Sequence, residues 1–393
     1  MRLVKRILTG TAALAVAAAI WIPCLHLFFA RGAEDFHSAK GLSPEAEQLA
    51  ARHLQLWTDP ALRARELERM RHSNAEWDFM GRTFLVWSLG EMGLRNPAAK
   101  KNYLPVMDQI IAETIRLEKE QGIYVFLMPY ARGRPYLMQP ARSQFLDSEI
   151  AMMLAARRMI EEKPEYKPLL TERVDAMVAR MRQGPVLSAE SYPNECWMFD
   201  NTAALAAMRM ADHLDGTDHG QFIKQWLTMA KDKLTDKTTG ILFSSYTVDG
   251  QALDGPEGSS IWMTSHFLRL ADEDFARDQY RRARKELGRR AVGFAWSREW
   301  PPSWIGAVDI DSGPVIPVLG ISPGASGMAF IAASSFGDDE YLAALAATLD
   351  FSGFPSRKEG RLKYCASNQV GDAALLYASV LGPMWGVIEG AKP

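Results

Sequence analysis

Most of this chain carries one of two helical patterns of apolar and polar positions, and the two patterns alternate along the sequence. One kind is dense in Ala, Met, Leu and Gly, carries almost no charge, and follows a loop rich in Gly, Pro, Ser, Asp and aromatic residues. The other kind places apolar residues at helical spacing with charges opposite them, as a helix with one face on a core does. The chain is therefore predicted to be almost entirely helical.

Segments of the first kind recur six times, with starts separated by roughly 45 to 65 residues, the length of one helical hairpin and a long loop. We place them at residues 77–90, 145–156, 200–208, 259–268, 325–333 and 368–377. Charged amphipathic helices are predicted between them, at residues 103–118, 165–181, 220–234, 275–287 and 339–349. Short β segments are expected at residues 240–246 and 314–319.

Six small-sided helices that alternate with charged ones predict two concentric layers, because only a helix with neighbours on nearly all sides can do without polar residues. The expected fold class is all-α, an (α/α)6 barrel or toroid over residues 43–393, with short β-hairpins in its loops. An open α-solenoid is the alternative. Solenoid repeats usually share a consensus, whereas these units match in pattern and not in letters, so we favour the closed barrel.

The N-terminus carries a targeting pattern. Three basic residues precede an uncharged run, 7–30, that is long enough to span a bilayer, which takes about 20 residues. A cleavable signal peptide needs small residues at positions −3 and −1 of the cut. Cleavage after Ala33 would place Arg31 at −3, and cleavage after Ala30 would place Phe28 there. An uncleaved transmembrane signal anchor is therefore predicted.

We expect residues 1–33 to form this anchor and residues 34–42 to form a polar linker. With the basic end of the anchor in the cytoplasm, the folded domain lies on the far side of the membrane, in the periplasm. Secretion to the periplasm after cleavage is the alternative.

Bulk composition narrows the function. A formal net charge of −2 gives no reason to expect nucleic acid as a partner. Eleven Trp, eleven Tyr and nineteen Met are enough to line an apolar ligand cavity. The metal motifs HExxH, HxH and CxxC are absent, as are the nucleotide and hydrolase motifs GxGxxG, GxxxxGKS/T and GxSxG. We therefore expect a small-molecule substrate and neither a metal nor a cofactor; a homo-oligomer is left open.

One loop concentrates chemistry more than any other segment. Residues 191–201, Ser-Tyr-Pro-Asn-Glu-Cys-Trp-Met-Phe-Asp-Asn, lie directly before an Ala-rich helix, with Asp200 or Asn201 interpreted as its cap. If the inner helices all run the same way, the loops before them gather at one end of the barrel and form a functional rim. The candidate binding residues of this rim are Trp77, Arg82, Tyr192, Asn194, Glu195, Cys196, Trp197, Asn201, Tyr246, Asp254, Trp262, Asp311 and Cys365.

Glu149 and Asp200 are the first candidates for catalysis, because each opens an inner helix that is otherwise small-sided or apolar. Desolvation would raise the pKa of both carboxyl groups, and a neighbouring carboxylate would raise one of them further. Such a pair supplies a protonated acid and an ionised base, which suits acid–base work on alcohols, glycosides or uronates. The alternatives are an N-cap for Asp200 and a buried ion pair for Glu149.

Asp78 is the third catalytic candidate, with capping of the first inner helix as its alternative role. Arg82, one turn later, is either its ion partner or a group that binds an anionic substrate. Cys196 precedes a helix, where a thiolate is favoured. No His lies close to it in sequence, so a buried or paired thiol is the simpler interpretation. Cys196 and Cys365 can pair only if the fold brings them together.

The stretch from Pro193 to Asn201, continuing through residues 216–218, resembles the corresponding stretch of the linalool dehydratase/isomerase family. The resemblance covers most of residues 70–385 more weakly. It implies an (α/α)6 barrel made with an export signal. It also implies cofactor-free acid–base chemistry on a tertiary terpene alcohol.

This chain departs from the family pattern at the reacting groups. Two family cysteines fall at Ser191 and Asp200, and a family histidine falls at Glu149. The resemblance therefore implies carboxyl groups in place of thiol and imidazole. Asp200 would protonate or deprotonate the reacting group with Glu149 as its counterpart, and Asp78 or Tyr192 would orient the alcohol.

Three functions remain in competition. The first is a lyase or isomerase that acts on a small, largely apolar alcohol. The second is a carbohydrate-active enzyme, a glycosidase, polysaccharide lyase or epimerase, by analogy with other toroids. The third is a membrane-anchored binding protein without catalysis. A closed Met-lined chamber would favour the first, an open Trp-floored trough the second, and a mouth filled by its own side chains the third.

Overall fold

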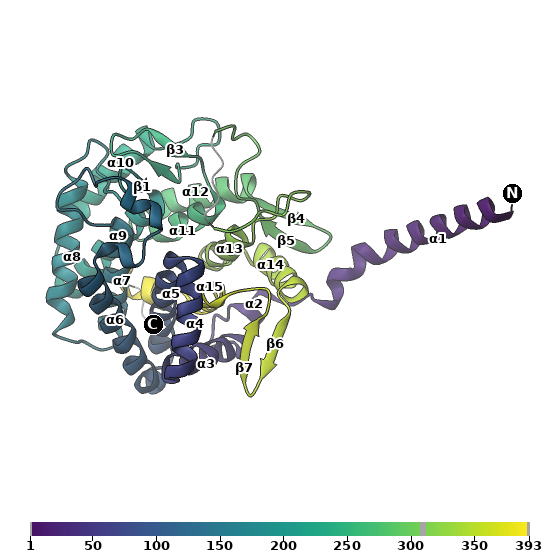
Figure 1. Cartoon of the computed structure of the whole chain (residues 1–393), viewed down its shortest axis with the longest axis horizontal. Helices are drawn as coiled ribbons and strands as arrows, with labels where there is room; N and C mark the ends of the chain where they lie inside the picture. The colour runs from purple at the N-terminus through teal and green to yellow at the C-terminus, as the bar shows by residue number, and fades with distance from the viewer. Residues whose placement is uncertain (1, 307–311, 391–393) are drawn as a thin grey trace.

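Six inner helices form a closed ring. The computed structural model describes residues 2–306 and 312–390. In the ring each inner helix packs against the next and the last returns to the first (Figure 1). The fold class is therefore the predicted (α/α)6 barrel. The inner helices are α5 (Ala75–Arg95), α7 (Gln144–Ile160), α9 (Met198–Asp215), α11 (Gly258–Leu268), α13 (Pro323–Phe336) and α15 (Gln369–Val380).

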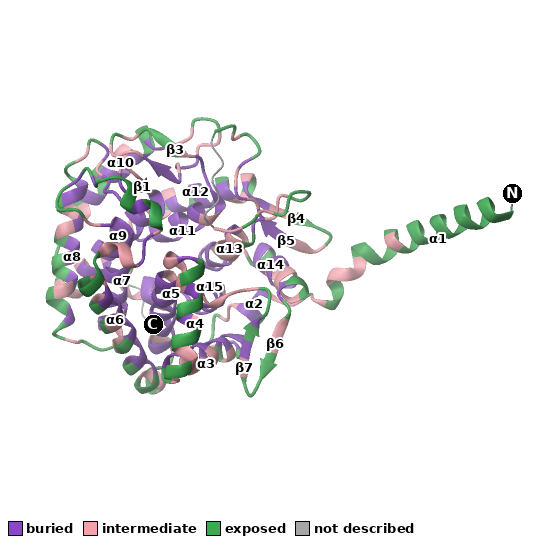
Figure 2. Cartoon of the chain, viewed as in Figure 1, coloured by how far each residue is buried: buried purple, intermediate pink, exposed green. Residues whose placement is uncertain are grey.

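A second layer of helices covers the ring from outside, and its members carry the charged faces that the sequence showed. Figure 2 shows the contrast, since the inner helices are buried along most of their length and the outer ones are exposed on one side. The outer helices are α3 (Pro44–Thr58), α4 (Pro60–Ser73), α6 (Lys100–Gln121), α8 (Tyr166–Met181), α10 (Gly220–Lys233), α12 (Glu273–Glu286) and α14 (Asp339–Ser352). Helix α16 (Pro383–Ile388) closes the end of the described chain.

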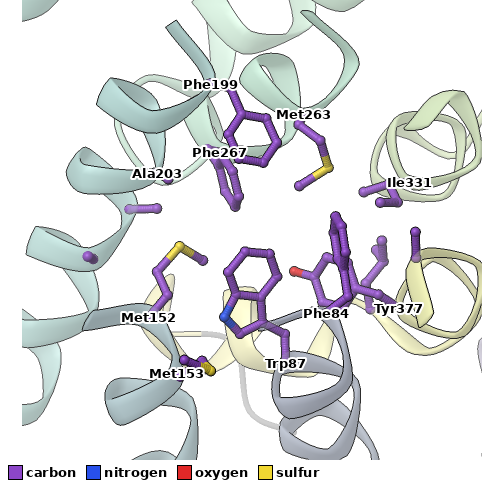
Figure 3. Close-up of a cluster of buried hydrophobic side chains, with 14 of the residues drawn as sticks. Phe84, Trp87, Met152, Met153, Phe199, Ala203, Met263, Phe267, Ile331 and Tyr377 are labelled. Carbon is purple, nitrogen blue, oxygen red and sulfur yellow. The ribbon is translucent and has the colours of Figure 1, made fainter. Parts of the chain in front are cut away.

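Apolar side chains from the inner helices fill the axis of the barrel (Figure 3). Trp87 on α5 lies edge-on to Phe267 on α11, with ring centroids 5.9 Å apart. Phe267 in turn meets Phe199 on α9 at 5.6 Å. All three rings are buried, so the barrel has a packed core and no open channel through it.

Short antiparallel strands occupy the loops. The expected β segment at residues 240–246 supplies one strand of a three-stranded sheet, and residues 314–319 supply an isolated bridge, Ile316 to Ile321. The positions of two hairpins were not predicted, because their strands are only four residues long and three of them carry Arg or Lys. The strands are β1 (Cys196–Trp197), β2 (Ser245–Tyr246) and β3 (Ala252–Asp254) in one sheet, β4 (Gly288–Ala291) with β5 (Phe294–Ser297), and β6 (Pro355–Lys358) with β7 (Arg361–Tyr364).

The N-terminal helix α1 (Arg2–Cys24), continued by the 3-10 turn η1 (Leu25–Phe28), projects away from the barrel and is exposed throughout most of its length (Figures 1 and 2). The span Arg2–Phe28 is long and apolar enough to cross a membrane, with a mean hydropathy of 1.9 in its best window. This match rests on length and composition alone.

Immediately after η1 the chain joins the barrel. The ring of Phe29 lies 5.3 Å from that of Phe351. Arg31 forms ion pairs with Glu45 and with Asp350, the latter with Nε 3.1 Å from Oδ2. The short helix α2 (Ala33–Phe36) buries Phe36 completely against α13 and α14 neighbours.

Candidate active site

A cavity of about 1360 Å³ opens at the N-terminal ends of the inner helices. The first turn of every inner helix contributes to its wall, so the predicted gathering of these loops at one end of the barrel is confirmed. The contributing residues include Glu76 on α5, Phe145 on α7, Asp200 on α9, Ser259 on α11, Gly324 on α13 and Val370 on α15.

The wall combines carboxyl groups with apolar and aromatic surface. Among the described residues that line it there is no Lys, Arg or His, so no positive side chain offsets the acidic ones. Phe199, whose ring also belongs to the packed core, forms part of the floor (Figure 3). The carboxyl groups are those of Glu76, Glu195, Asp200, Asp254, Glu257 and Glu299, and the aromatic rings nearest them include Trp77, Tyr130, Tyr192 and Trp197.

Asp200 is the third residue of α9 and faces the cavity. It does not cap the helix, which corrects the expected capping role: the cap position is Trp197, and no side chain caps there. Burial raises the pKa of Asp200 to about 8, and the charge of Glu76 adds to the rise, while the Ser191 hydroxyl works against it. The carboxyl group is therefore protonated at neutral pH, as a proton donor must be.

Glu76 lies across the cavity on the first turn of α5. It accepts a hydrogen bond from the Tyr192 hydroxyl, and that hydroxyl accepts one from the Met128 backbone N–H at 2.9 Å. The ring of Tyr130 stacks on that of Tyr192 with centroids 4.8 Å apart. Tyr130 donates to Glu195 Oε2 at 3.2 Å. These contacts join α5, the loop before α7 and the loop before α9 into one wall.

Glu149 is buried on α7 and does not line the cavity. Neither of its carboxyl oxygens has a hydrogen-bond partner among the described residues. Burial raises the pKa of Glu149 well above its usual value. The nearby Thr83 hydroxyl opposes this rise, and the charges of Asp200 and Glu76 add smaller increases. Glu149 is therefore a neutral carboxyl behind the wall that carries Asp200.

Asp78 points to the outer layer and not into the cavity. Its carboxylate accepts from Arg71 Nη2 at 2.6 Å and from Arg82 Nε at 2.9 Å. Arg82 reaches Glu113 as well, at 3.1 Å, and takes the ion-partner role of its two alternatives. The first inner helix is capped by Asn74, whose side chain accepts from the backbone N–H of Glu76. Asp78 is therefore not its cap.

Four other rim candidates lie behind the cavity wall and do not line the cavity: Tyr246, Trp262, Asn194 and Asn201. The Tyr246 hydroxyl donates to Ser188 Oγ at 2.8 Å, and Trp262 Nε1 donates to Ser297 Oγ at 2.9 Å. The Asn194 backbone N–H donates to Glu190 Oε1 at 2.7 Å. The Asn201 side chain accepts a hydrogen bond from the Ala189 backbone N–H and donates to the backbone carbonyls of Ala189 and Trp197.

The two cysteines of the barrel are both free, so they do not form the disulfide that was left open. Cys196 is buried in β1, paired with Tyr246 of β2, and burial raises the pKa of its thiol. Cys365 is exposed after β7. Asp311 lies outside the described residues. Trp77, Tyr192, Glu195, Trp197, Asp200 and Asp254 are the predicted residues that the fold brings together on the cavity wall.

Three acidic groups of the wall, Glu76, Glu257 and Glu299, are not among the candidates from the sequence. Glu76 sits two residues after the capping Asn74, and that cap pattern places it in the first turn. Glu299 follows β5 in a loop with no helical pattern to mark it. Glu299 accepts from the Ser259 hydroxyl at 2.5 Å and also from the hydroxyls of Ser312 and Ser322.

No group of three or more His, Cys, Asp or Glu side chains that could hold a metal ion occurs in residues 2–306 and 312–390. The carboxyl groups of the wall are therefore spread around the cavity, and they face apolar surface between them.

These features define an (α/α)6-barrel protein with an acidic, aromatic-lined cavity at the N-terminal ends of its inner helices. The family model for linalool dehydratase/isomerase matches residues 152–370, more than half of the chain. The chain belongs to the linalool dehydratase/isomerase family. A search of the curated proteins found no significant match.

Solved structures of sugar-cleaving enzymes share the fold. The chain is similar to the GH76A α-1,6-mannanase from Salegentibacter sp. HEL1_6, with a TM-score of 0.55 and 12% identity over 85% of this chain and 97% of that one. It is also similar to a family 105 glycoside hydrolase from C. acetobutylicum ATCC 824, with a TM-score of 0.52 and 12% identity over 88% and 98%. At such low identity these similarities concern the fold alone.

Proposed function

We propose that the protein is a cofactor-free acid–base enzyme, a lyase or isomerase that acts on a small, largely apolar alcohol in the barrel cavity. The observation that carries the proposal is Asp200, whose pKa of about 8 keeps it protonated while it faces an apolar cavity. Membership of the linalool dehydratase/isomerase family supports the same class of reaction.

In the proposed reaction Asp200 donates its proton to the hydroxyl oxygen of the alcohol. The carbon–oxygen bond breaks, water leaves, and a carbocation remains. A carboxylate then removes a proton from the neighbouring carbon, and the electron pair of that carbon–hydrogen bond forms the double bond. We assign this base to Glu76, which faces the same cavity and accepts from Tyr192. Return of water at the other end of an allylic cation gives the isomer.

The wall suits a cation better than an anion. Carboxylates and aromatic faces both attract positive charge, and no described Lys, Arg or His lines the cavity to oppose it. A uronate or another anionic substrate would meet carboxyl groups and no described cation to pair with. Glu149 stays neutral behind the wall, so we assign the negative charge of the site to the groups that reach the cavity.

Replacement of the proposed acid and base tests the proposal. With linalool as substrate and gas chromatography of the products, we expect Asp200→Asn and Glu76→Gln each to lower turnover at least about a hundredfold, the usual worth of a general acid or base. The matched control is Asp212→Asn, at the opposite end of α9, where the carboxylate accepts from His219. We expect this variant to keep wild-type turnover.

Wild-type turnover in both Asp200→Asn and Glu76→Gln would contradict the proposed roles. No turnover of any tertiary alcohol by the wild-type protein, combined with saturable binding, would instead support the membrane-anchored binding protein.

A carbohydrate-active enzyme is the second candidate. The observation that favours it is the acidic rim of Glu195 and Asp254 beside Trp197, since paired carboxyl groups and a Trp platform also serve glycosidases. Burial raises the pKa of Glu195 too, as a glycosidase acid requires. Release of reducing sugar from α-1,6-linked mannan, lost in Glu195→Gln, would favour this function.

We further propose that α1 is an uncleaved anchor and that the barrel lies on the periplasmic side. The segment directly after α1 supports this, because Phe29, Arg31 and Phe36 are all fixed in the barrel. A cut after Ala30 or Ala33 would separate Phe29 from the residues it packs with. Protease protection in intact cells, with and without outer-membrane permeabilisation, measures the side.

A further inference from the structure

The cavity has a second end, far richer in apolar side chains than the acidic wall. There it is lined by residues that are also open to solvent: Val292 in the β4–β5 turn, Ile316 and Leu319 in the following loop, and Phe351 at the end of α14. Each of these four is between 44% and 52% exposed. Because the same side chains face both the cavity and the solvent, they mark an opening.

Further exposed apolar side chains surround that opening. Val318 is 94% exposed, Phe354 66% and Phe28, at the root of α1, 71%. We call these seven residues, Phe28, Val292, Ile316, Val318, Leu319, Phe351 and Phe354, the apolar mouth. A contiguous exposed apolar surface next to a cavity is uncommon on a protein that meets only water.

Contacts between the elements show that the apolar mouth is one place. The ring of Phe294 on β5 lies 5.3 Å from that of Phe351, and Phe351 also meets Phe29 at 5.3 Å. Trp296 Nε1 donates to the Leu319 carbonyl at 3.2 Å. Figure 1 shows the β4–β5 hairpin, α14 and the root of α1 side by side.

The length of the anchor brings this surface to the bilayer. The uncharged stretch 7–28, which is helical up to the barrel, spans roughly 33 Å at about 1.5 Å per residue, against a hydrocarbon core of about 30 Å. Phe29 is already packed against the barrel, and Arg31 is already paired with Asp350 at 3.1 Å. No spacer therefore separates the membrane from the apolar mouth.

We propose that the apolar mouth rests in the interface of the bilayer that α1 spans, and that a lipid-soluble alcohol enters the cavity directly from the membrane. The docking depends only on α1 and the mouth, whereas the identity of the substrate rests on the proposed function. Two exposed cations on β6, Arg357 and Lys358, follow Phe354 by three and four residues, and anionic lipid headgroups attract such side chains.

The cavity volume leaves room for the larger alcohols of the proposed class. Pockets for drug-sized ligands usually measure about 300 to 1000 Å³, and this one reaches about 1360 Å³. An alcohol whose hydroxyl lies at Asp200 and whose isoprenoid tail points to the apolar mouth would contact both ends of the cavity.

Depth measurements on the full chain in lipid nanodiscs test the docking. A nitroxide is attached to Val318→Cys or Phe354→Cys in a Cys24→Ser, Cys365→Ser background, and its collisions with oxygen and with a water-soluble nickel chelate are compared. The control is Ala179→Cys, exposed on α8, which lies on the side of the barrel away from α1 (Figure 1). We expect lipid exposure at both mouth positions and water exposure at the control. Water exposure at all three positions would overturn the docking.

Entry from the membrane is tested with the double variant Val318→Glu, Phe354→Glu, whose side chains do not line the cavity. We expect turnover of geranyllinalool dissolved in the nanodisc to fall at least about tenfold, while turnover of water-soluble methylbutenol stays unchanged. An equal change for both alcohols would overturn membrane entry. If the wild-type protein converts neither alcohol, the proposed function fails, and the depth measurement still decides the docking.

Discussion

Asp200 and Asp78 are buried carboxyl groups in the first turns of two inner helices, α9 and α5, yet their surroundings give them opposite roles. Asp78 lies between two guanidinium groups, Arg71 and Arg82, at 2.6 and 2.9 Å. Asp200 forms no ion pair with a described Lys, Arg or His, and it faces the cavity, so burial raises its pKa. In the sequence the two aspartates looked alike, because Arg71, which pairs with Asp78, lies on a separate helix.

The protonated state of Asp200 makes a prediction about stability. Its folded pKa of about 8 lies above the unfolded value of about 3.9. The folded protein therefore keeps a proton that the unfolded chain has already lost between these values. Unfolding free energy should fall as pH rises from about 4 to about 8, by up to about 1.4 kcal/mol per pH unit from this group. Above pH 8 this contribution is fully lost.

Asp200→Asn, which keeps the group neutral, should remove that dependence. We expect the variant to gain on the wild type as pH rises from 5 to 9, as measured by thermal unfolding in a common buffer series. A difference in Tm that stays constant across the series would contradict a protonated Asp200. The same titration should appear as loss of turnover above pH 8.

At the scale of single elements, the helices were predictable and the loops that shape the site were not. Each predicted inner helix lies within an observed one apart from its first residue in α15, because burial on nearly all sides keeps these helices mostly apolar along their length. The 191–201 loop is different. Its shape depends on β1 pairing with β2, some fifty residues later, and no local pattern encodes that pairing.

Asn201 is the side chain that fixes this loop to its helix. It accepts from the Ala189 N–H at 2.9 Å and donates to the carbonyls of Ala189 and Trp197. We expect Asn201→Ala to cost about 2 to 4 kcal/mol in urea unfolding, since it leaves buried backbone groups unpaired. The control is Asn102→Ala, exposed on α6, with a change under about 0.5 kcal/mol. Equal effects of the two would contradict the role of Asn201.

At the scale of the whole molecule, the barrel includes the segment between the apolar helix and α3. Glu45, buried at the start of α3, pairs with Arg31 and accepts from the Tyr364 hydroxyl at 2.7 Å. Phe36 packs against Phe330 with ring centroids 4.8 Å apart. These contacts close the outer layer between α14 and α3, where the first and last parts of the barrel meet.

Two truncations separate the anchor from this closure. Deletion of residues 2–28 should leave Tm nearly unchanged, because Arg31 and Phe36 remain. Deletion of residues 2–42 should cost about 3 kcal/mol or more, since it removes a buried aromatic side chain and leaves Glu45 buried without its cation. Calorimetry of the two proteins measures the difference. Equal stability would show that the segment is a linker with no part in the barrel.

The sequence by itself determined the two layers, the six inner helices and the end of the barrel at which their first turns gather. These follow from local composition, because a helix with neighbours on nearly all sides is mostly small-sided or apolar, whereas an outer helix exposes a charged face. The apolar run before the barrel was equally predictable from the sequence, since its length and lack of charge are local properties. Family membership was visible in the same way, from a stretch of contiguous residues.

The tertiary structure alone decided which carboxyl groups meet. In the folded chain Glu76 and Asp200 face the cavity, and Glu149 lies behind its wall. Asp78 pairs with Arg71 and Arg82. Protonation depends on burial and on charges brought together from different helices, and neither quantity is written in any single stretch of the chain. For the same reason only the folded chain joined the cavity to the apolar mouth at the root of α1.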